Sequence, residues 1–446
     1  MGLPILFGGG APSRYRIDNS LRFRAANSAY LTRTPSSAGN RRTWTWSAWV
    51  KRGELGRVIN LYSAGVTAND TDFYGIEWSA LDQLNITTGL TQMRLSTAVF
   101  RDTTAWYHIV VASDTTQATA SNRLRVYVNG VELTAFNVNN NIAQNTDTAV
   151  NSTQIQSIGR RAAIGTQYDD SLHANEIMVD GQALTPSSFG QFDAATNQWV
   201  PRRYSGTYGT NGFLLEFKNA TSTTTIGNDT SGNGNHWTTS GISVTAGVTF
   251  DQSTDTPTNN FATLNPLDRS PDAALSEANT RWTYASNAYY PAARSTIHFD
   301  IGASQRWVAE FTKTAAASGG LAQEYIGVIA NNFNLPASVN DAINNVGTYY
   351  YMGNGNKSQG TGGAQTVTAY GATYAVNDVI GVVAGNGQIE FFKNGVSQGV
   401  AFTGLTGTFS FAPTGLLGFA VSANYGSRPF AHTYTGALAL NTSNLP

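Results

Sequence analysis

The chain of 446 residues contains no cysteine, little charge and no long apolar run. Without cysteine it has no disulfide, no thiolate metal ligand and no thiol nucleophile. Charged residues make up 12% of the chain and the net charge is −1, so nothing in the charge favours nucleic acid or an anionic membrane as a partner. No apolar stretch reaches the roughly 18 residues that crossing a bilayer requires. We therefore expect no nucleic-acid partner and no membrane insertion.

The first residues are apolar and rich in glycine. Leu3, Ile5, Leu6 and Phe7 precede three consecutive glycines. The segment lacks the basic start and small-residue cleavage pattern of a signal peptide. One interpretation is a frayed terminus. The other, which we prefer because four apolar side chains gain nothing from facing water, is an assembly arm over residues 1–14 that docks on a partner.

Two hairpin patterns lie far apart in the chain. Leu124–Leu133 reads LRVYVNGVEL and Gly387–Val396 reads GQIEFFKNGV. Asn-Gly between strand-like runs is a strong hairpin signal, because a type I′ turn needs positive φ at both central residues. The pair predicts two separate β domains that use a similar internal hairpin.

Short strand-like runs separated by Gly, Asn and Thr continue through both halves of the chain. None shows a convincing 3.6-residue period over twelve residues, although Ser270–Asn279 is compatible with one short helix. The predicted fold class is therefore all-β, with two jelly-roll-like antiparallel sandwiches in series. We place the sandwiches at residues 15–255, including a closing linker, and 256–434, followed by a loosely attached tail at 435–446.

Residues with catalytic or metal-binding chemistry are scattered. Retaining glycoside hydrolysis needs two carboxylates roughly 5 Å apart, yet the glutamates are isolated in the sequence. The five histidines show no metal-ligand spacing. We expect no enzyme and no obligatory cofactor. Calcium is the one candidate ion, with Asp169 and Asp170, or Asp70 and Asp72, as oxygen ligands.

Tyrosines in the second half supply candidate ligand contacts. Tyr349, Tyr350 and Tyr351 are consecutive, so at least one points away from the core in a strand. Tyr289, Tyr290 and Asn354 add aromatic and amide groups nearby. Aromatic faces beside amides suit sugar rings, and they suit protein interfaces equally well. We predict a ligand-binding face formed by these six residues.

Residues 15–255 resemble the laminin-G and concanavalin-A-like jelly roll. The segments that carry the resemblance follow that family's order: TWSAWVKR at Thr45–Arg52, AWYHIVVASD at Ala105–Asp114, LRVYVNGVEL at Leu124–Leu133, IGR at Ile158–Arg160 and the closing element at Tyr168–Phe189. The resemblance implies a lectin-like sandwich and a loop-rim position for any calcium.

The second half resembles the SPRY fold. NDVIGVVAGNGQIEFFKNGVSQGVAF at Asn377–Phe402 is close to that family's hairpin signature, and NYGSRPF at Asn424–Phe430 is similar to its terminal motif. Ala384–Asn386 replaces the family's usual acidic turn, which removes any contact that depends on that acid.

The pairing of these two domains resembles structural proteins of tailed bacteriophages. It implies a non-enzymatic virion protein of a tail fibre or surface appendage, attached to other virion proteins as a homo-oligomer. Its sandwiches would be displayed for attachment to host glycans or for subunit contacts. The alternatives are a secreted carbohydrate-binding module and, after it, a concanavalin-like glycoside hydrolase.

Overall fold

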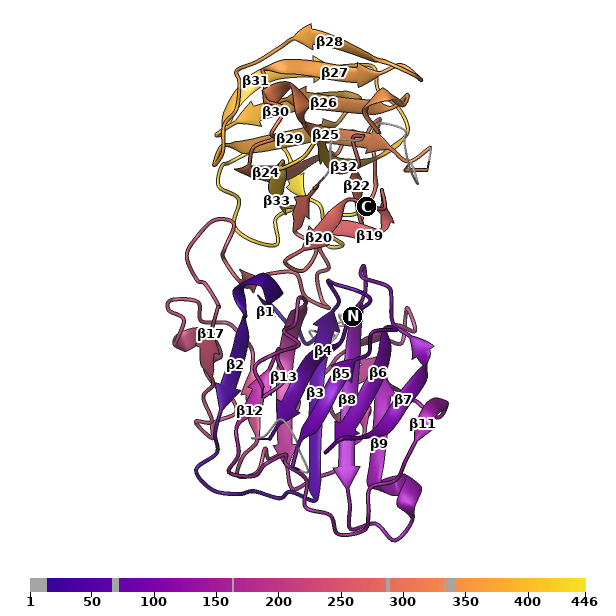
Figure 1. The fold of residues 1–446 in the computed structure, drawn as a ribbon, viewed down its shortest axis with the longest axis vertical. Coiled ribbons are helices and arrows are strands. Elements are labelled where there is room, and N and C mark those ends of the chain that lie inside the picture. The colour runs from indigo at the N-terminus through magenta and orange to yellow at the C-terminus, as the bar shows by residue number, and fades with distance from the viewer. Residues whose placement is uncertain (1–13, 66–71, 163, 286–288, 333, 336–341) are drawn as a thin grey trace, which may run out of the picture.

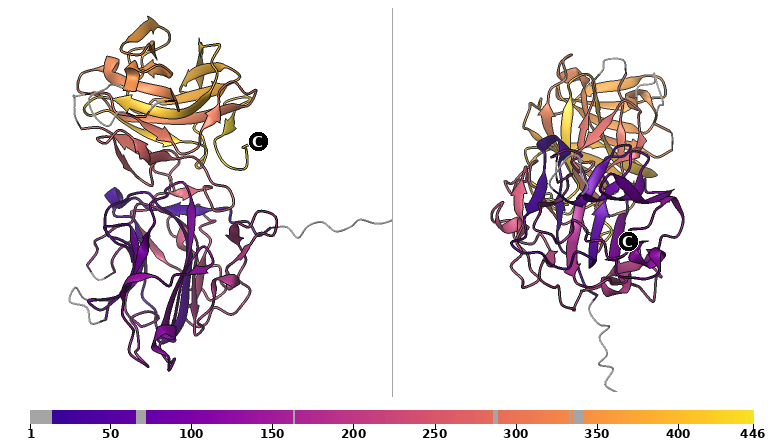
Figure 2. Two further views of the ribbon diagram at one scale, coloured as in Figure 1. Left: turned by 90° about the vertical axis from the view of Figure 1, so that its right-hand side faces the viewer. Right: turned by 60° about the horizontal axis from the view of Figure 1, so that its bottom comes forward.

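The computed structural model describes residues 14–65, 72–162, 164–285, 289–332, 334–335 and 342–446. In this part of the chain the regular elements are β-strands and short 3-10 helices, with no α-helix. The strands form two double-layered domains stacked end to end along the long axis (Figure 1), and Figure 2 shows the same stacking from two further directions. The 3-10 helices are η1 (Ala25–Asn27), η2 (Ala120–Arg123), η3 (Pro186–Ser188), η4 (Thr225–Gly227), η5 (Leu321–Gln323) and η6 (Ala342–Asn344).

The N-terminal domain packs two antiparallel sheets against each other. Sheet 1 runs in the order β10 (Val131–Glu132), β9 (Leu124–Val128), β8 (Trp106–Asp114), β3 (Thr43–Lys51), β13 (Leu172–Asp180), β1 (Ser20–Arg22) and β18 (Gln252–Ser253), with β16 (Phe213–Leu215) also paired to β13. Sheet 2 runs β11 (Phe136–Asn139), β7 (Thr91–Val99), β6 (Gln83–Thr88), β5 (Tyr74–Trp78), β4 (Ile59–Ala64), β12 (Gln156–Ile158), β2 (Tyr30–Arg33) and β17 (Thr238–Ser240). A separate hairpin joins β14 (Gly190–Phe192) to β15 (Trp199–Pro201).

The C-terminal domain has the same double-layered plan. Sheet 3 runs β20 (Ala274–Ser276), β21 (Arg281–Thr283), β33 (Ala420–Asn424), β24 (Arg306–Ala315), β29 (Val379–Gly385), β30 (Gln388–Lys393) and β31 (Val396–Phe402), with β34 (Leu438–Ala439) parallel to β24. Sheet 4 runs β23 (Phe299–Asp300), β32 (Thr408–Gly415), β25 (Glu324–Ala330), β26 (Thr348–Met352), β27 (Asn356–Gly360) and β28 (Gln365–Ala369). A short pair joins β19 (Leu264–Arg269) to β22 (Ala293–Ser295).

The tryptophans of β3 show how the sequence sets the core. Trp44 and Trp46 are fully buried in the cluster between sheets 1 and 2. Trp49 belongs to a different cluster, on the opposite face of sheet 1. Successive side chains of a strand point to opposite faces, so the change of phase in TWTWSAWV places apolar residues on both sides.

Both Asn-Gly hairpins form as the sequence predicts. Asn129 and Gly130 have φ of 50° and 82° between β9 and β10, and Asn394 and Gly395 have φ of 48° and 79° between β30 and β31. Positive φ at both central residues is the type I′ geometry. In each turn the asparagine Oδ1 accepts a hydrogen bond from a strand amide, His108 N or Val379 N, at 2.8 Å.

A buried ion pair joins the two sheets of the C-terminal domain. Lys313 continues the inward-facing alternation of β24, and its Nζ lies 2.6 Å from Glu324 Oε2 on β25. Both side chains are at most 1% exposed. The second oxygen of Glu324 accepts the amide of Ala317 at 2.9 Å. Removing one partner of such a pair strongly destabilises a protein, because the remaining charge stays buried without its partner.

The domain junction begins with a turn where a helix is predicted. Over Ser270–Asn279 the chain forms β20 and then a left-handed turn, so the helix prediction is wrong. Glu277, Ala278 and Asn279 have φ of 57°, 56° and 59°. The amides of Glu277 and Ala278 donate to the buried carboxylate of Asp170, at 3.0 and 3.3 Å, and Ala25 N donates at 3.3 Å. Hydrogen bonds to a carboxylate of the N-terminal domain thus hold a backbone conformation that most residues avoid.

Further buried polar contacts cross the junction. Lys51 Nζ, 2% exposed, donates to Asp255 Oδ2 and Asn260 Oδ1 at 2.7 Å and to the Phe261 carbonyl at 2.8 Å. Arg22 donates to Asp251 at 3.1 Å and to Thr280 Oγ1 at 2.9 Å. The two domains are therefore joined by directional contacts between buried groups.

The C-terminal tail is built into the domain. β34 pairs with β24, Leu440 is fully buried, and Leu440 O accepts the amide of Ala262 at 2.9 Å. The predicted loose attachment of residues 435–446 is wrong. Leu440 of the tail joins the core between sheets 3 and 4.

Candidate functional site

Sheet 2 presents a polar face on its side away from the core. Glu77 on β5 and Asn85 and Thr87 on β6 point outward, because they alternate with core-facing neighbours. The core-facing residues of these strands are Tyr74, Ile76, Trp78, Leu84 and Ile86. Glu77 and Asn85 lie directly opposite each other in the antiparallel register.

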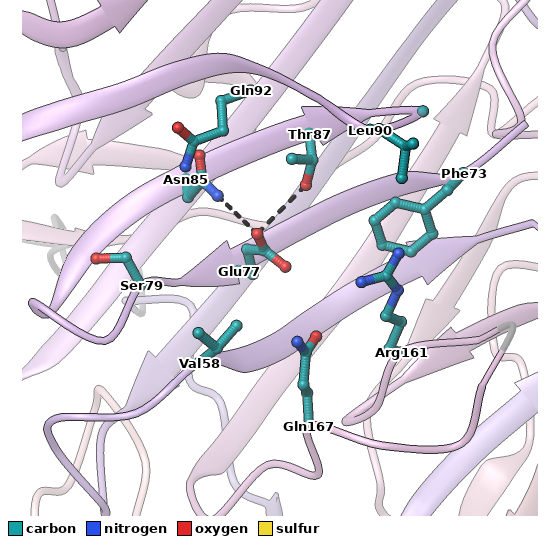
Figure 3. Close-up of a pocket in the computed structure, with 11 residues that line it drawn as sticks. Val58, Phe73, Glu77, Ser79, Asn85, Thr87, Leu90, Gln92, Arg161 and Gln167 are labelled. Carbon is teal, nitrogen blue, oxygen red and sulfur yellow. Dashed lines mark hydrogen bonds between the residues drawn. The ribbon is translucent and has the colours of Figure 1, made fainter. Parts of the chain in front are cut away.

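Glu77 is the centre of this polar face. Asn85 Nδ2 donates to Glu77 Oε1 at 2.6 Å, and Thr87 Oγ1 donates to the same oxygen at 3.3 Å (Figure 3). These two bonds come from the neighbouring strand, so the sheet register itself orients the carboxylate.

The segment that follows β12 returns along the polar face and forms one wall. The guanidinium of Arg161 lies 4.3 Å from the centre of the Phe73 ring. Asn60 Nδ2 donates to Gln167 Oε1 at 2.5 Å, and Asn60 N donates to Gln167 O at 3.2 Å. Figure 3 shows Arg161 and Gln167 on the side of Glu77 opposite Gln92 and Asn85.

Together these residues enclose a pocket of about 260 Å³. It is lined by Val58, Phe73, Glu77, Ser79, Asn85, Thr87, Gly89, Leu90, Gln92, Arg161 and Gln167. Leu90 is 75% exposed at the rim. The lining combines one carboxylate with three amides, two hydroxyls and a guanidinium, so it offers many hydrogen bonds around a single negative group.

Burial raises the pKa of Glu77, and the hydrogen bonds from Asn85 and Thr87 oppose that rise. Asn85 is 4% exposed, and its Oδ1 has no hydrogen-bond partner. A buried amide oxygen without a partner costs free energy that a ligand donor would recover. The pocket therefore holds an unfilled acceptor beside a carboxylate that already accepts from two side chains.

This chemistry suits recognition of hydroxyl groups. A sugar hydroxyl both donates and accepts, and the amides, hydroxyls and carboxylate supply both kinds of partner. Among the lining residues, all of which lie in the described part of the chain, Glu77 is the only carboxylate. The pair that retaining hydrolysis requires is not assembled from this lining.

The predicted tyrosine face is only partly at the surface. Tyr350 and Tyr351 are 0% exposed and Tyr289 is 6% exposed, so their expected exposure is wrong. Tyr351 packs in the core between sheets 3 and 4. Tyr350 does point to the other side of β26, but that side is covered by a second apolar cluster that includes Ile343.

The other predicted ligand residues are partly buried. Tyr349 packs its ring 5.0 Å from Phe402, and Tyr290 packs 5.2 Å from Tyr325. Asn354 Oδ1 accepts the amide of Asn356 at 3.2 Å, within the turn between β26 and β27. The six residues do not form one continuous exposed face.

The aspartates predicted as calcium ligands are occupied as hydrogen-bond acceptors. Asp169 Oδ2 lies 2.7 Å from His173 Nε2 and 2.7 Å from Ser171 Oγ, and Asp169 is fully buried. Asp170 accepts backbone amides at the junction, and burial raises its pKa to about 7. Oxygens directed at N–H and O–H donors, with a carboxyl that is hard to ionise, do not fit a calcium site.

Asp72 Oδ2 accepts a bond from Gln154 at 3.1 Å, while Asp70 lies outside the described residues. No group of three or more His, Cys, Asp or Glu side chains positioned for a metal ion is found in the described part of the chain.

The predicted arm residues Leu3, Ile5, Leu6 and Phe7 lie outside the residues that the structure describes. Within the described ranges no helix is long and apolar enough to span a bilayer.

Sequence reasoning missed the Glu77 pocket because its members are far apart along the chain. Glu77 is an isolated glutamate, and Arg161 and Gln167 reach it only through the path of the chain after β12. The available signal was the alternation in FYGIEW, which places Phe73 and Glu77 on the face opposite the core residues.

Two family models match parts of the chain. The model of the concanavalin A-like lectin/glucanases superfamily, named Laminin_G_3, matches residues 25–173, and the SPRY domain model matches residues 315–428. The first match contains the whole of the Glu77 pocket. No curated protein matches the chain.

Several solved structures are similar to the chain at low identity. The SPRY domain of human HERC1 is 15% identical, covering 36% of this chain and 96% of its own, with a TM-score of 0.29. A putative carbohydrate binding protein from Bacteroides ovatus is 14% identical, covering 50% and 58%, with a TM-score of 0.34. Domains LG4-5 of the mouse laminin alpha1 chain are 10% identical, covering 97% of each chain, with a TM-score of 0.31. The chain therefore carries a region similar to the concanavalin A-like lectin/glucanases superfamily, followed by a region similar to the SPRY domain.

Proposed function

We propose that this protein binds carbohydrate through the Glu77 pocket on the outer face of sheet 2. The observation that carries the proposal is the buried, unpartnered Oδ1 of Asn85 beside the carboxylate of Glu77, in a cavity of about 260 Å³. The match of this domain to a superfamily that contains lectins supports the same class of ligand.

A neutral, hydroxyl-rich ligand fits the electrostatics of the pocket. Arg161 and Glu77 both line the cavity, and the remaining polar groups are amides and hydroxyls. Polar groups that converge on one small cavity give orientation and specificity, while Leu90 and Phe73 offer apolar contact to a sugar ring.

The test is a glycan array with the full chain, followed by titration calorimetry on the glycans that bind. Glu77→Gln removes the charge and keeps the shape, and we expect it to weaken binding by about 10- to 100-fold, as for the loss of a hydrogen bond to a charged group. Gln92→Ala removes a side chain from the opposite wall and should also weaken binding.

The matched control is Glu132→Gln, an equivalent change at an exposed glutamate on β10, away from the pocket lining. It should leave glycan binding unchanged. Unchanged binding in both pocket variants, with unfolding curves like the parent's, would show that the glycan is held elsewhere. An array without any bound glycan would contradict the proposed function itself.

The finer proposal is that this binding serves attachment of a bacteriophage particle to its host. It is supported by the resemblance of the two-domain arrangement to tail-fibre and surface proteins. Reading frames for tail or capsid proteins beside its gene, and detection of the chain in purified particles by mass spectrometry, would support it. A chain found only as free secreted protein would favour the alternative of a secreted carbohydrate-binding module.

The hydrolase alternative has its own assay. Incubation with each bound glycan, followed by a reducing-sugar measurement, should show no release, because Glu77 is the only carboxylate that lines the pocket. Release that Glu77→Gln abolishes would instead make the protein a glycosidase.

A further inference from the structure

A second and larger cavity lies on the other side of the N-terminal domain. It has a volume of about 880 Å³ and runs between sheet 1, the β14–β15 hairpin, the linker to the C-terminal domain and the C-terminal tail. Its lining includes five aromatic residues, Tyr15, Trp49, Trp106, Phe192 and Trp199, beside prolines, amides, hydroxyls and two arginines. We refer to this cavity as the aromatic groove.

The aromatic groove is rigidly built around Trp199. Its indole Nε1 donates to His108 Nδ1 at 2.9 Å, and the Trp49 ring stacks on the His108 ring with the ring centres 4.6 Å apart. A Cβ added at Gly130 or Gly190 would come within 2.4 Å of the Trp199 ring, so these two glycines let the indole lie close to the backbone. Burial lowers the pKa of His108 to about 3, which leaves the wall uncharged there.

Several polar groups along the groove are already paired within the protein. Trp106 Nε1 donates to Asp255 at 3.1 Å, and Asn260 Oδ1 and Nδ2 bond to Lys51 Nζ and Thr104 O. Thr258 Oγ1 donates to the carbonyl of Ile17 at 2.7 Å. Ring surface is among what is left for an occupant, including Phe192, which is 50% exposed. The apolar surface of the groove suits an uncharged apolar chain segment, whose burial there costs no unpaired polar group.

The chain carries one such segment close by. Arg14 lines the groove and pairs with Asp193, and the thirteen residues before it include the uncharged run Leu3–Phe7. We propose that Leu3–Phe7 occupies the aromatic groove of its own chain.

The connection between segment and groove permits this docking. Gly8–Ser13 separates Phe7 from Arg14 and contains three glycines, which allow the chain to reverse direction. Seven residue steps reach at most about 23–25 Å, measured from a residue that already lies at the groove. A short tether gives an effective concentration in the millimolar range, which favours docking within one chain over docking between chains.

The absence of cysteine makes the docking directly testable by cross-linking. In the full chain, Leu6→Cys combined with Val200→Cys, which lines the groove, should form a disulfide within one chain under mild oxidation. The matched control combines Leu6→Cys with Val396→Cys, which is 65% exposed on β31 of the other domain. We expect a fast-migrating monomer on a non-reducing gel for the first pair and none for the control.

Each result decides the proposal. A covalent dimer across Leu6 and Val200 would place the segment in the groove of a second copy and would overturn docking within the chain. Equal cross-linking of both pairs, or none in either, would also overturn it. As a second measurement, Ile5→Asp should raise acrylamide quenching of tryptophan fluorescence, whereas Ala11→Asp in the connecting segment should not. Glycan binding at the Glu77 pocket should be the same in all of these variants, so failure here is distinguishable from failure of the proposed function.

Discussion

Replacing Asp170 with asparagine should remove one pH-dependent contribution to stability at the domain junction. Asp170 is 2% exposed and accepts the amides of Ala25, Glu277 and Ala278. Burial raises the pKa of this carboxyl to about 7, and the nearby charge of Glu54 acts in the same direction. Asparagine keeps the shape and one acceptor oxygen but does not titrate.

The direction and size of the change in unfolding free energy with pH follow from proton linkage. A carboxyl whose folded-state pKa is raised binds its proton in the folded protein at a pH where the unfolded chain has released it. Its contribution is most favourable below the usual value of 3.8 and is lost as the pH rises toward 7. At about 1.4 kcal/mol per pKa unit, the free energy of unfolding of the parent should fall by roughly 3 kcal/mol between pH 5 and pH 8, relative to that of Asp170→Asn.

The assay is guanidinium unfolding of parent and variant at several pH values across this window. Asp170→Ala should be destabilised throughout, by about 1–3 kcal/mol for each buried amide left without an acceptor. Asp18→Asn, at an exposed aspartate, is the control and should track the parent. Parallel stability profiles for the parent and Asp170→Asn would refute the assignment of this ionisation to Asp170.

Three further changes test the interior of the C-terminal domain. Asn394→Pro forces negative φ where the hairpin has +48°, so calorimetry should show loss of that domain's transition, and an unchanged transition would contradict the turn assignment. Tyr350→Ala should lower the free energy of unfolding by about 3–5 kcal/mol through cavity formation, measured by denaturant titration, and a loss of binding without destabilisation would speak against its burial. Lys313→Met leaves Glu324 buried without its cation and should lower the free energy of unfolding by about 3–5 kcal/mol. The double variant Lys313→Met with Glu324→Gln should recover part of this loss. Equal destabilisation in the single and double variants would exclude the ion pair as the cause.

The sequence predicted features that depend on local pattern. The all-β class, the two type I′ hairpins and the inward phase of Trp44 and Trp46 all follow from strand alternation or turn chemistry, which act over a few residues. Strand alternation also places Tyr350 and Tyr351 on opposite faces of β26, as predicted.

What could not be predicted depends on contacts between distant segments. The far face of β26 is covered by residues around Tyr290 and Ile343, so a side chain that leaves one core enters another. In the same way, the Glu77 pocket exists because the chain after β12 places Arg161 against Phe73. The left-handed turn at Glu277 depends on the carboxylate of Asp170 more than one hundred residues earlier, which no local propensity reports.

The two hairpin turns also affect how fast the protein is degraded by deamidation. Asparagine followed by glycine is the sequence most open to deamidation, in which the glycine amide nitrogen attacks the side-chain carbonyl carbon. In both turns the carbonyl oxygen of that side chain is held by a strand amide, His108 N for Asn129 and Val379 N for Asn394. The fixed side chain must leave this bond before it can cyclise, so each folded turn protects an asparagine that would be open to deamidation in an unfolded chain. The rate of deamidation at these positions is then governed by how often each hairpin opens.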